Sequence, residues 1–222
     1  MKNQNNIKGI IFDMDGVIID SNSFHYENWN SVFKEKFNIE IPKEEFASRL
    51  GESAIHFTEF FVKKYEIDKK YKITADKLLP EIIEKYKNIS HLKLKEGIKE
   101  KLPELKKSYK IALATGANKD WALKVLEHFD IKNYFDFVIA GNEVKRAKPE
   151  PEIFIKAAQG LKLKANECVV IEDAELGIIA AKKAGCFVIS IPDEMTKKQD
   201  HELADLQLDS IKKLDLKNLK DF

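Results

Sequence analysis

The chain has 222 residues, and its 38 lysines and arginines nearly balance its 37 aspartates and glutamates, which gives a formal net charge of +1. This balance excludes a polycation built to bind nucleic-acid backbones, and a hydrophobic fraction of 44% excludes a disordered chain. The length suits one large domain, or a domain that carries a smaller insert.

In chain order, the first predicted element is a strand, and a helical stretch follows it. Residues 7–13 (IKGIIFD) form a continuous apolar run that ends in an acidic residue, which is typical of a strand buried on both faces. From residue 22 to residue 94 the apolar residues instead recur at helical spacing. This interval predicts helices over 23–37, 43–50, 53–65 and 74–87, with residues 67–73 as a break.

The rest of the chain alternates strands with helices. Further apolar runs predict strands at 110–115, 137–140, 168–173 and 186–191, and helices at 97–108, 119–129, 151–161 and 174–184. Such alternation predicts an α/β fold, with a Rossmann-like parallel sheet flanked by helices. We therefore expect an α/β core domain made of residues 1–21 and 95–222, with an inserted all-helical domain at 22–94. A final strand and helix within 204–222 would complete the core.

Polar side chains follow four of the predicted strands. Because the carboxyl ends of parallel strands meet at one edge of a sheet, we expect these side chains to lie close together. They are Asp13 and Asp15 after the first strand, Thr115 at the end of the second, Lys148 in the loop after the third, and Glu172 and Asp173 at the end of the fourth. A turn or a helix cap would explain each of them singly. Their joint placement favours a site of chemistry.

The types of these residues suit a divalent cation beside a phosphate group. Mg²⁺ takes oxygen ligands and is commonly held by one or two carboxylates together with phosphate oxygens, so Asp13, Asp173 and Glu172 are candidate ligands. A lysine such as Lys148 offers a point charge to phosphate, and the Thr115 hydroxyl adds a donor. A carboxylate at such a site could also attack phosphorus.

Four segments are similar to the four motifs of the haloacid dehalogenase superfamily. They are FDMDGVIIDS at 12–21, ALATG at 112–116, KRAKPEPEIF at 145–154 and VIEDAELGIIAAKKAG at 170–185. The chain most resembles the branch of β-phosphoglucomutase and sugar-phosphate phosphatases, in which an α-helical C1 cap follows the first motif, as the helical insert does here. The resemblance implies a Mg²⁺-dependent hydrolase of phosphoric monoesters that works through an aspartyl-phosphate intermediate.

The resemblance also implies a role for each core residue. Asp13 would be the nucleophile that accepts the phosphoryl group, and Asp15 would be the general acid and then the general base. The phosphoryl oxygens would be held by Thr115, Gly116 and Lys148. The ligands of Mg²⁺ would be Asp13, the backbone carbonyl of Asp15, Asp173, and Glu172 directly or through water.

The helical insert should determine the substrate, and it leaves two activities open. A mutase that works on a bisphosphate must hold a second phosphate, and the family's mutase supplies an arginine after a Gly-x-Ser turn. The similar turn at 51–53 is followed by Ala54, so we favour a phosphatase of small metabolites, above all sugar phosphates, over a β-phosphoglucomutase-type mutase. The candidate substrate contacts are His25, Glu52, Ser53 and Lys77. A catalytically silent ligand-binding protein is disfavoured, because every catalytic position holds a competent side chain.

Composition also bears on partners and location. A net charge near zero without interleaved aromatic and basic residues disfavours nucleic-acid binding, and the apolar runs are too short to cross a membrane. The polar start MKNQNN shows no signal peptide, and we expect Cys168 and Cys186 to be buried free thiols. We therefore expect a cytoplasmic monomer whose partner is a small phosphorylated substrate.

Overall fold

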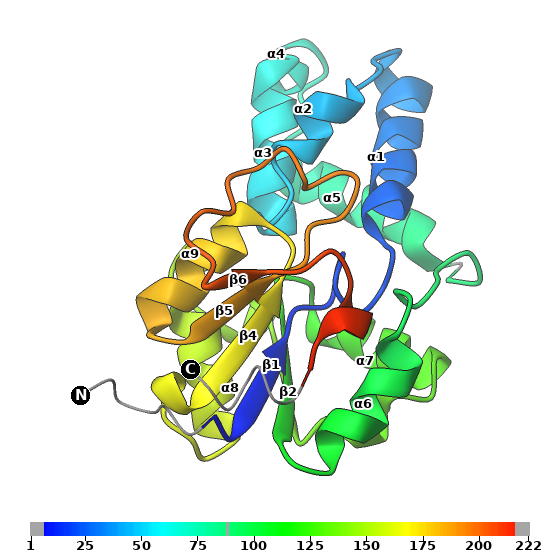
Figure 1. Ribbon diagram of the computed structural model, residues 1–222. Helices are drawn as coiled ribbons and strands as arrows, with labels where there is room; N and C mark the ends of the chain where they lie inside the picture. The colour runs from blue at the N-terminus through cyan, green and yellow to red at the C-terminus, as the bar shows by residue number, and fades with distance from the viewer. Residues whose placement is uncertain (1–6, 88, 216–222) are drawn as a thin grey trace.

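The computed structural model describes residues 7–87 and 89–215, and it contains a parallel sheet with helices on both faces (Figure 1). Over these residues the sheet has six strands in the order β3-β2-β1-β4-β5-β6. The strands are β1 (Gly9–Phe12), β2 (Lys110–Thr115), β3 (Phe137–Ala140), β4 (Cys168–Glu172), β5 (Phe187–Ser190) and β6 (Leu206–Gln207). The predicted Rossmann-like α/β fold is confirmed.

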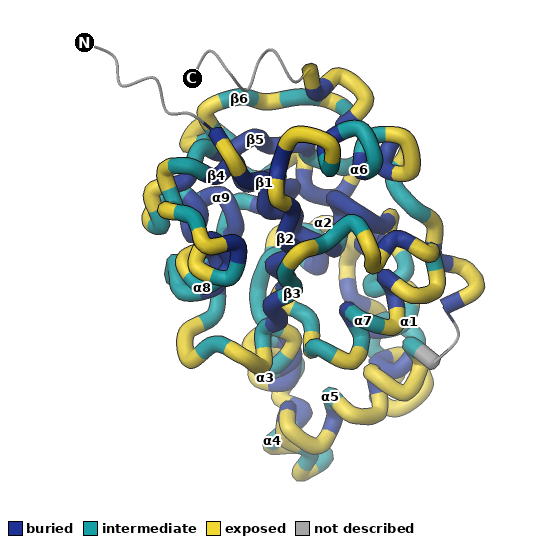
Figure 2. Tube along the Cα trace, turned by 90° about the horizontal axis from the view of Figure 1, so that it is seen from below, coloured by how far each residue is buried: buried dark blue, intermediate teal, exposed yellow. Residues whose placement is uncertain are grey.

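Alternation along each strand divides the core between the two faces of the sheet. Ile10 and Phe12 of β1 face the cluster that includes helices α6 (Ile98–Lys106) and α7 (Lys119–His128). Ile11 faces the opposite cluster, which includes α8 (Glu152–Gly160) and α9 (Glu175–Ala184). Because both faces are covered, β1 and β4 are mostly apolar and are buried over their whole length (Figure 2).

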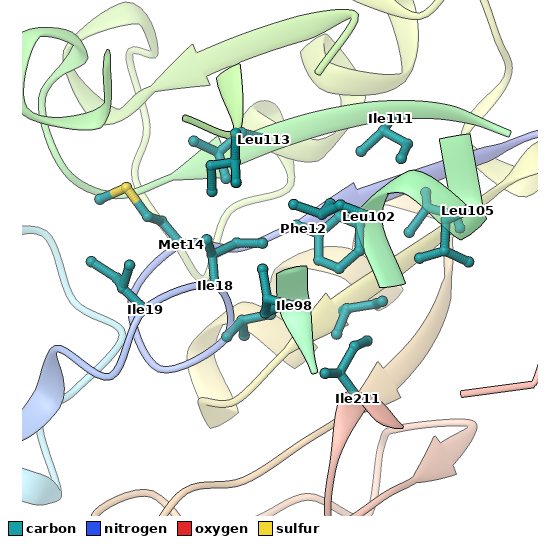
Figure 3. Close-up of a cluster of buried hydrophobic side chains, with 14 of the residues drawn as sticks. Phe12, Met14, Ile18, Ile19, Ile98, Leu102, Leu105, Ile111, Leu113 and Ile211 are labelled. Atoms are coloured by element: carbon teal, nitrogen blue, oxygen red, sulfur yellow. The ribbon is translucent and has the colours of Figure 1, made fainter. Parts of the chain in front are cut away.

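The first of these clusters also fixes the loop that follows β1. Figure 3 shows Met14, Ile18 and Ile19 of that loop beside Phe12 and Ile98, and all five side chains are fully buried. The backbone of the loop is held by bonds from the amides of Ile18 and Ile19 to the carbonyl of Met14. The chain segment that carries Asp13 and Asp15 is therefore anchored by apolar side chains on either side of each carboxylate.

Helices fill the interval between β1 and α6, and together they form a second body above the carboxyl ends of the strands (Figure 1). We call this part, residues 22–87, the helical block. It comprises α1 (Asn22–Phe37), α2 (Lys43–Ala47), α3 (Ala54–Lys64), α4 (Ile67–Lys70), α5 (Ala75–Glu84) and the 3₁₀ turn η1 (Lys85–Lys87). Its interior is a separate apolar cluster rich in aromatic rings, among them Trp29, Phe33, Phe46, Phe57 and Phe61.

Two sequence predictions about individual elements were wrong. Residues 67–73 are not simply a break, because Ile67 is fully buried and starts the short helix α4. Within 204–215 the chain forms β6 and then only the 3₁₀ turn η5 (Ile211–Lys213) in place of an α-helix. The remainder of that predicted helix, residues 216–222, and the MKNQNN segment lie outside the described residues.

Two further observations concern the cysteines and the membrane. Cys168 and Cys186 are buried free thiols, as predicted. Across residues 7–87 and 89–215, none of the helices has the length and apolar character needed to cross a membrane.

Candidate active site

Three carboxylates converge where β1 and β4 end. These strands are hydrogen-bonded neighbours, with Phe12 beside Ile171, so Asp13 lies next to Glu172 and Asp173 although about 160 residues separate them in sequence. Each of the three is buried, and each offers one oxygen within 4.8 Å of the others. Such a group of oxygen ligands suits a hard divalent cation.

Two glycines make room for this convergence. Gly16 has a φ of +78°, and a Cβ there would lie 2.0 Å from Oδ2 of Asp173. A Cβ on Gly177, in the first turn of α9, would lie 1.7 Å from Oε1 of Glu172. Because any larger residue would displace one of these carboxylates, both positions require glycine.

Lys148 supplies the positive charge at this cluster. Its Nζ donates to Oδ1 of Asp13 at 2.7 Å and also to Oε1 of Glu172, and its side chain is only 6% exposed. The other oxygen of Glu172 accepts the backbone N–H groups of Asp173 and Ala174 at 2.8 and 3.0 Å. Glu172 is therefore fixed on both sides, and its orientation does not depend on a ligand.

Burial leaves the negative charge of the cluster poorly balanced. Burial raises the pKa of Asp13 to about 8, with Lys148 opposing the rise and Glu172 and Asp15 adding to it. Burial, followed by the charges of Glu172 and Asp193, raises the pKa of Asp173 well above its ordinary value. Since one ammonium faces three carboxylates, a divalent cation would restore the balance, and the residues present fit one.

Asp15 lies outside this trio and has its own partners. Its Oδ1 accepts the Ser21 hydroxyl at 2.6 Å and lies 2.8 Å from Nε2 of His25. Nδ1 of His25 lies 3.0 Å from the Tyr86 hydroxyl, which accepts the indole N–H of Trp29 at 2.8 Å. Burial opposes ionisation of Asp15, but His25 and Ser21 hold its pKa below the ordinary value. The chain of bonds suits a His25 imidazole that carries its proton on Nε2.

A cavity of about 170 Å³ lies between the carboxylate cluster and the helical block. Its floor contains Asp13, Asp15, Lys148, Glu172 and Asp173, together with Gly116, Ala117, Asn118 and Trp121 from the end of β2 and the start of α7. Its opposite wall is mostly apolar, with Trp29, Phe46, Leu50, Ala54, Phe57, Leu79, Ile83 and Tyr86. In the described part of the chain, Lys148 is the only lysine or arginine that lines it.

Glu52 is the acidic residue of the apolar wall. Its Oε1 pairs with the Arg49 guanidinium at 2.5 Å, while its Oε2 is buried without a hydrogen-bond partner among the described residues. Arg49 does not line the cavity but stacks on the Phe60 ring, with its Cζ 4.2 Å from the ring centroid. Burial raises the pKa of Glu52, against the nearby charge of Arg49. Oε2 of Glu52 could therefore accept a hydrogen bond from a ligand in the cavity.

The structure brings most of the predicted residues to this cavity and leaves three away from its surface. Thr115 is fully buried behind the cavity, and its Oγ1 accepts the backbone N–H of Ala117 at 3.1 Å. Ser53 caps α3 by accepting the amide of His56 at 3.5 Å. Lys77 is exposed on α5 and does not line the cavity.

Sequence reasoning did not single out Asn22, Tyr86, Asn118, Trp121 or Asp193. Asn22 directly follows the first motif, and Asn118 caps α7 shortly after the second, so proximity to a motif was a usable signal for both. Tyr86 and Asp193 lie outside the motif segments, in the helical block and in the loop after β5. Only the folded chain places those two near Asp15 and Asp173.

Comparison with known proteins identifies a family and relatives that match most of the chain. The family described as haloacid dehalogenase-like hydrolase matches residues 10–191. A phosphorylated carbohydrates phosphatase of Thermotoga maritima is 31% identical over 182 residues, which cover 81% of this chain and 82% of that protein. A β-phosphoglucomutase of Bacillus subtilis is 30% identical over 206 residues and 83% of both chains. The crystal structure of β-phosphoglucomutase from Clostridium difficile matches with a TM-score of 0.80 and 29% identity, over 96% of this chain and 95% of that one.

Proposed function

The chain belongs to the haloacid dehalogenase-like hydrolase family, and we propose that it is a Mg²⁺-dependent phosphatase that removes phosphate from small metabolites, above all sugar phosphates. The observation that carries the proposal is the joint exposure of Asp13, Asp15 and Lys148 to one cavity that an apolar wall closes from above. We further propose that residues 22–94, which include the helical block, act as a cap, and that the protein works as a cytoplasmic monomer.

The proposed reaction has two steps, and Asp13 is regenerated at the end. An oxygen of Asp13 attacks phosphorus, so that an Oδ–P bond forms while the bond to the leaving oxygen breaks and Asp15 donates a proton to that oxygen. Water then attacks the phosphorus of the aspartyl phosphate and gives a proton to Asp15, while the Oδ–P bond breaks, so that phosphate leaves and Asp13 returns to a carboxylate. Lys148 and Gly116, with Thr115 behind them, would hold the phosphoryl oxygens throughout.

The cation has a defined place in this proposal. Asp13, Asp173 and the backbone carbonyl of Asp15 would hold it, with Glu172 directly or through water, and when bound it would neutralise charge on the transferring phosphoryl group. His25 and Ser21 keep the Asp15 side chain beside the cavity before a substrate enters. Because both favour the ionised form of Asp15, it must first take up the proton that it donates, and the monoanion of a phosphate monoester can supply that proton.

The shape and chemistry of the cavity support a substrate with one phosphate. Lys148 is the one lysine or arginine on the described cavity surface, and it lies at the floor beside Asp13. Opposite it, Glu52 offers an acceptor to a hydroxyl, and the rings of Trp29 and Phe57 could pack against the apolar face of a sugar. The relative in Thermotoga maritima is named for phosphorylated carbohydrates, which supports the same class.

A mutase is the second candidate, because relatives in Bacillus subtilis and Clostridium difficile are named β-phosphoglucomutase. A mutase would need a positively charged side chain on the apolar wall to hold the second phosphate of its bisphosphate intermediate. Ala54 lines the cavity after the 51–53 turn, and Arg49 is engaged with Glu52 and Phe60. This arrangement favours hydrolysis over transfer to a second sugar oxygen.

The test is phosphate release from a panel of sugar phosphates with Mg²⁺, with EDTA, and with Asp13→Asn. We expect the wild-type protein to release phosphate with Mg²⁺ but not with EDTA, and we expect Asp13→Asn to release none. Activity that persists in Asp13→Asn would exclude the proposed nucleophile. Conversion of β-glucose 1-phosphate to glucose 6-phosphate with a bisphosphate primer, without release of phosphate, would establish the mutase instead.

A further inference from the structure

The loop after β5 belongs to the core domain but contacts the helical block. Met195 joins the apolar cluster of the block. The side-chain amide of Gln199 donates to the carbonyls of Ala47 and Leu50 at 2.8 and 3.3 Å, and Lys198 pairs with Glu44 at 2.7 Å. This loop, residues 192–199, is therefore a bridge between the two bodies of the molecule.

Asp193 is the buried carboxylate of this bridging loop, with a side chain only 6% exposed. Its Oδ1 accepts the backbone N–H groups of Met195 and Thr196 at 2.7 and 3.0 Å, which closes a turn. Its Oδ2 accepts the side-chain amide of Asn22 at 2.7 Å and lies 4.0 Å from Nζ of Lys95. Asn22 and Lys95 stand on the two connections between the core and the helical block, so both connections meet at Asp193.

Asn22 carries this contact on to the carboxylate cluster. The same Nδ2 that donates to Asp193 also donates to Oδ2 of Asp173, at 3.0 Å. The two hydrogens of one amide group are thus shared between Asp193 and Asp173. Because an amide is planar, fixing one of its hydrogens fixes the direction of the other. The Thr196 hydroxyl lies 3.4 Å from the same Asp173 oxygen and adds a second, longer contact from the bridging loop.

We propose that Asp193 is a positioning residue for the cation site: through Asn22 it orients Asp173, so that affinity for Mg²⁺ depends on the first turn of α1 being held against the core. The proposal rests on the proposed role of Asp173 as a ligand. Partners that orient metal ligands commonly change affinity by about 10- to 100-fold when they are removed. No separate role is needed for Asp193 in the reaction itself.

Asp193→Asn separates this role from a role in folding the loop. The Asn oxygen can still accept the amides of Met195 and Thr196, so the turn is retained. Its NH₂ group then faces the NH₂ group of Asn22, and two donors cannot bond. If Asn22 rotates its amide to relieve this, its oxygen meets the Asp173 carboxylate. In the first case Asn22 loses the bond that fixes its amide, and in the second it loses its bond to Asp173, so either way Asp173 is no longer oriented through Asp193.

The experiment is calorimetric titration of Mg²⁺ into the full chain without substrate, accompanied by a melting temperature for each variant. We expect Asp193→Asn to bind Mg²⁺ about tenfold more weakly. The control is Asp200→Asn, an exposed aspartate close to the same loop, which should bind as the wild type does. In an Asn22→Ala background, Asp193→Asn should cause no further loss, since the link is already broken.

The outcomes separate the two proposals. Unchanged Mg²⁺ affinity in Asp193→Asn, or an equal loss in the presence and absence of Asn22, would overturn the positioning role while leaving the phosphatase intact. Failure of the wild-type protein itself to bind Mg²⁺ would count against the proposed cation, and so against the function on which this inference rests. A lower melting temperature with unchanged affinity would assign Asp193 to stability alone.

Discussion

The sheet and the helical block meet the same cavity with different chemistry and different means of support. The sheet presents charged groups at strand ends, where strand pairing and buried apolar neighbours fix the backbone on each side of Asp13. The block presents aromatic and aliphatic side chains from helices that pack together by contacts between aromatic rings. The rings of Phe46 and Phe57, for example, have centroids 4.7 Å apart. Changes in the sheet should therefore alter chemistry first, whereas changes in the block should alter stability and substrate fit first.

After Asp13→Asn, the largest effect on the sheet side of the cavity is expected from Asp15→Asn. Loss of a general acid and base lowers kcat by about 10²- to 10⁴-fold. The reason is that the leaving alkoxide of a sugar phosphate needs a proton, so the loss of kcat/KM, which reports transfer to Asp13, should be smaller with p-nitrophenyl phosphate, whose leaving group needs none. Values of kcat/KM for both substrates check this, because they exclude the hydrolysis step that both substrates share. An equal loss of kcat/KM on both would contradict the acid role of Asp15.

Phe61→Ala tests the block. Phe61 is fully buried and contacts Phe33, Phe57, Phe60 and Tyr65, but it does not line the cavity. Truncating such a ring costs about 3–5 kcal/mol of the free energy of unfolding, because it leaves a cavity. Urea denaturation measures the loss, and kcat at low temperature should stay near that of the wild type. Ile83→Ala, at a residue 40% exposed, is the matched control for stability.

If Phe61→Ala lowered kcat as much as Asp15→Asn does and left stability unaltered, the proposed difference between the helical block and the sheet would be wrong. A large loss of stability in Asp15→Asn would also contradict it.

The smallest expected effect concerns Asp136, at the edge of the sheet. Burial alone would raise its pKa, but bonds from Lys106 and from the Ile111 N–H lower it overall. A carboxyl whose pKa falls on folding adds stability above its unfolded pKa of about 3.9, and this stability is lost as the pH falls through the folded value. Its side chain is 40% exposed, so solvent screening limits the contribution to about 0.5 kcal/mol.

Asp136→Asn should therefore lower the free energy of unfolding slightly at pH 7, and the difference from wild type should vanish at the acid end. Urea titrations of both proteins from pH 7 downwards provide the measurement. A difference that grew on acidification would reverse the sign of the proposed linkage.

The sequence predicts the sheet well because most strands have a local signal in the sequence. Residues 110–115 and 137–140 match β2 and β3 at both ends, since a short apolar run between polar residues has few alternatives. The carboxylates could be placed together for the same reason, because strand ends in a parallel sheet share an edge. Helix α4 was missed because it is one turn long and Ile67 alone anchors it.

The wall of the cavity could not be read from the sequence in the same way. Aromatic residues at helical spacing line the interior of the block and the cavity alike, so the pattern does not say which of Trp29, Phe33 and Phe57 face a substrate. Glu52, in the turn before α3, lines the cavity, whereas Lys77 of α5 lies outside it, and the sequence gives no local sign of that difference. The link from Asp193 to Asp173 joins a distant loop to a motif and has no local signal at all.

The order of strands across the sheet also has a consequence for the newly made chain. β1 comes first among the strands in the chain but lies between β2 and β4 in the sheet, so Asp13 is synthesised about 160 residues before its neighbours Glu172 and Asp173. The helical block leaves the ribosome complete long before them, and its apolar cluster consists of its own residues apart from Met195. A nascent chain can thus enclose an aromatic interior early, yet it gains its acidic trio only when β4 has emerged and paired. The acidic trio, and the catalysis that we propose for it, therefore becomes possible only after residues 168–173 have been synthesised.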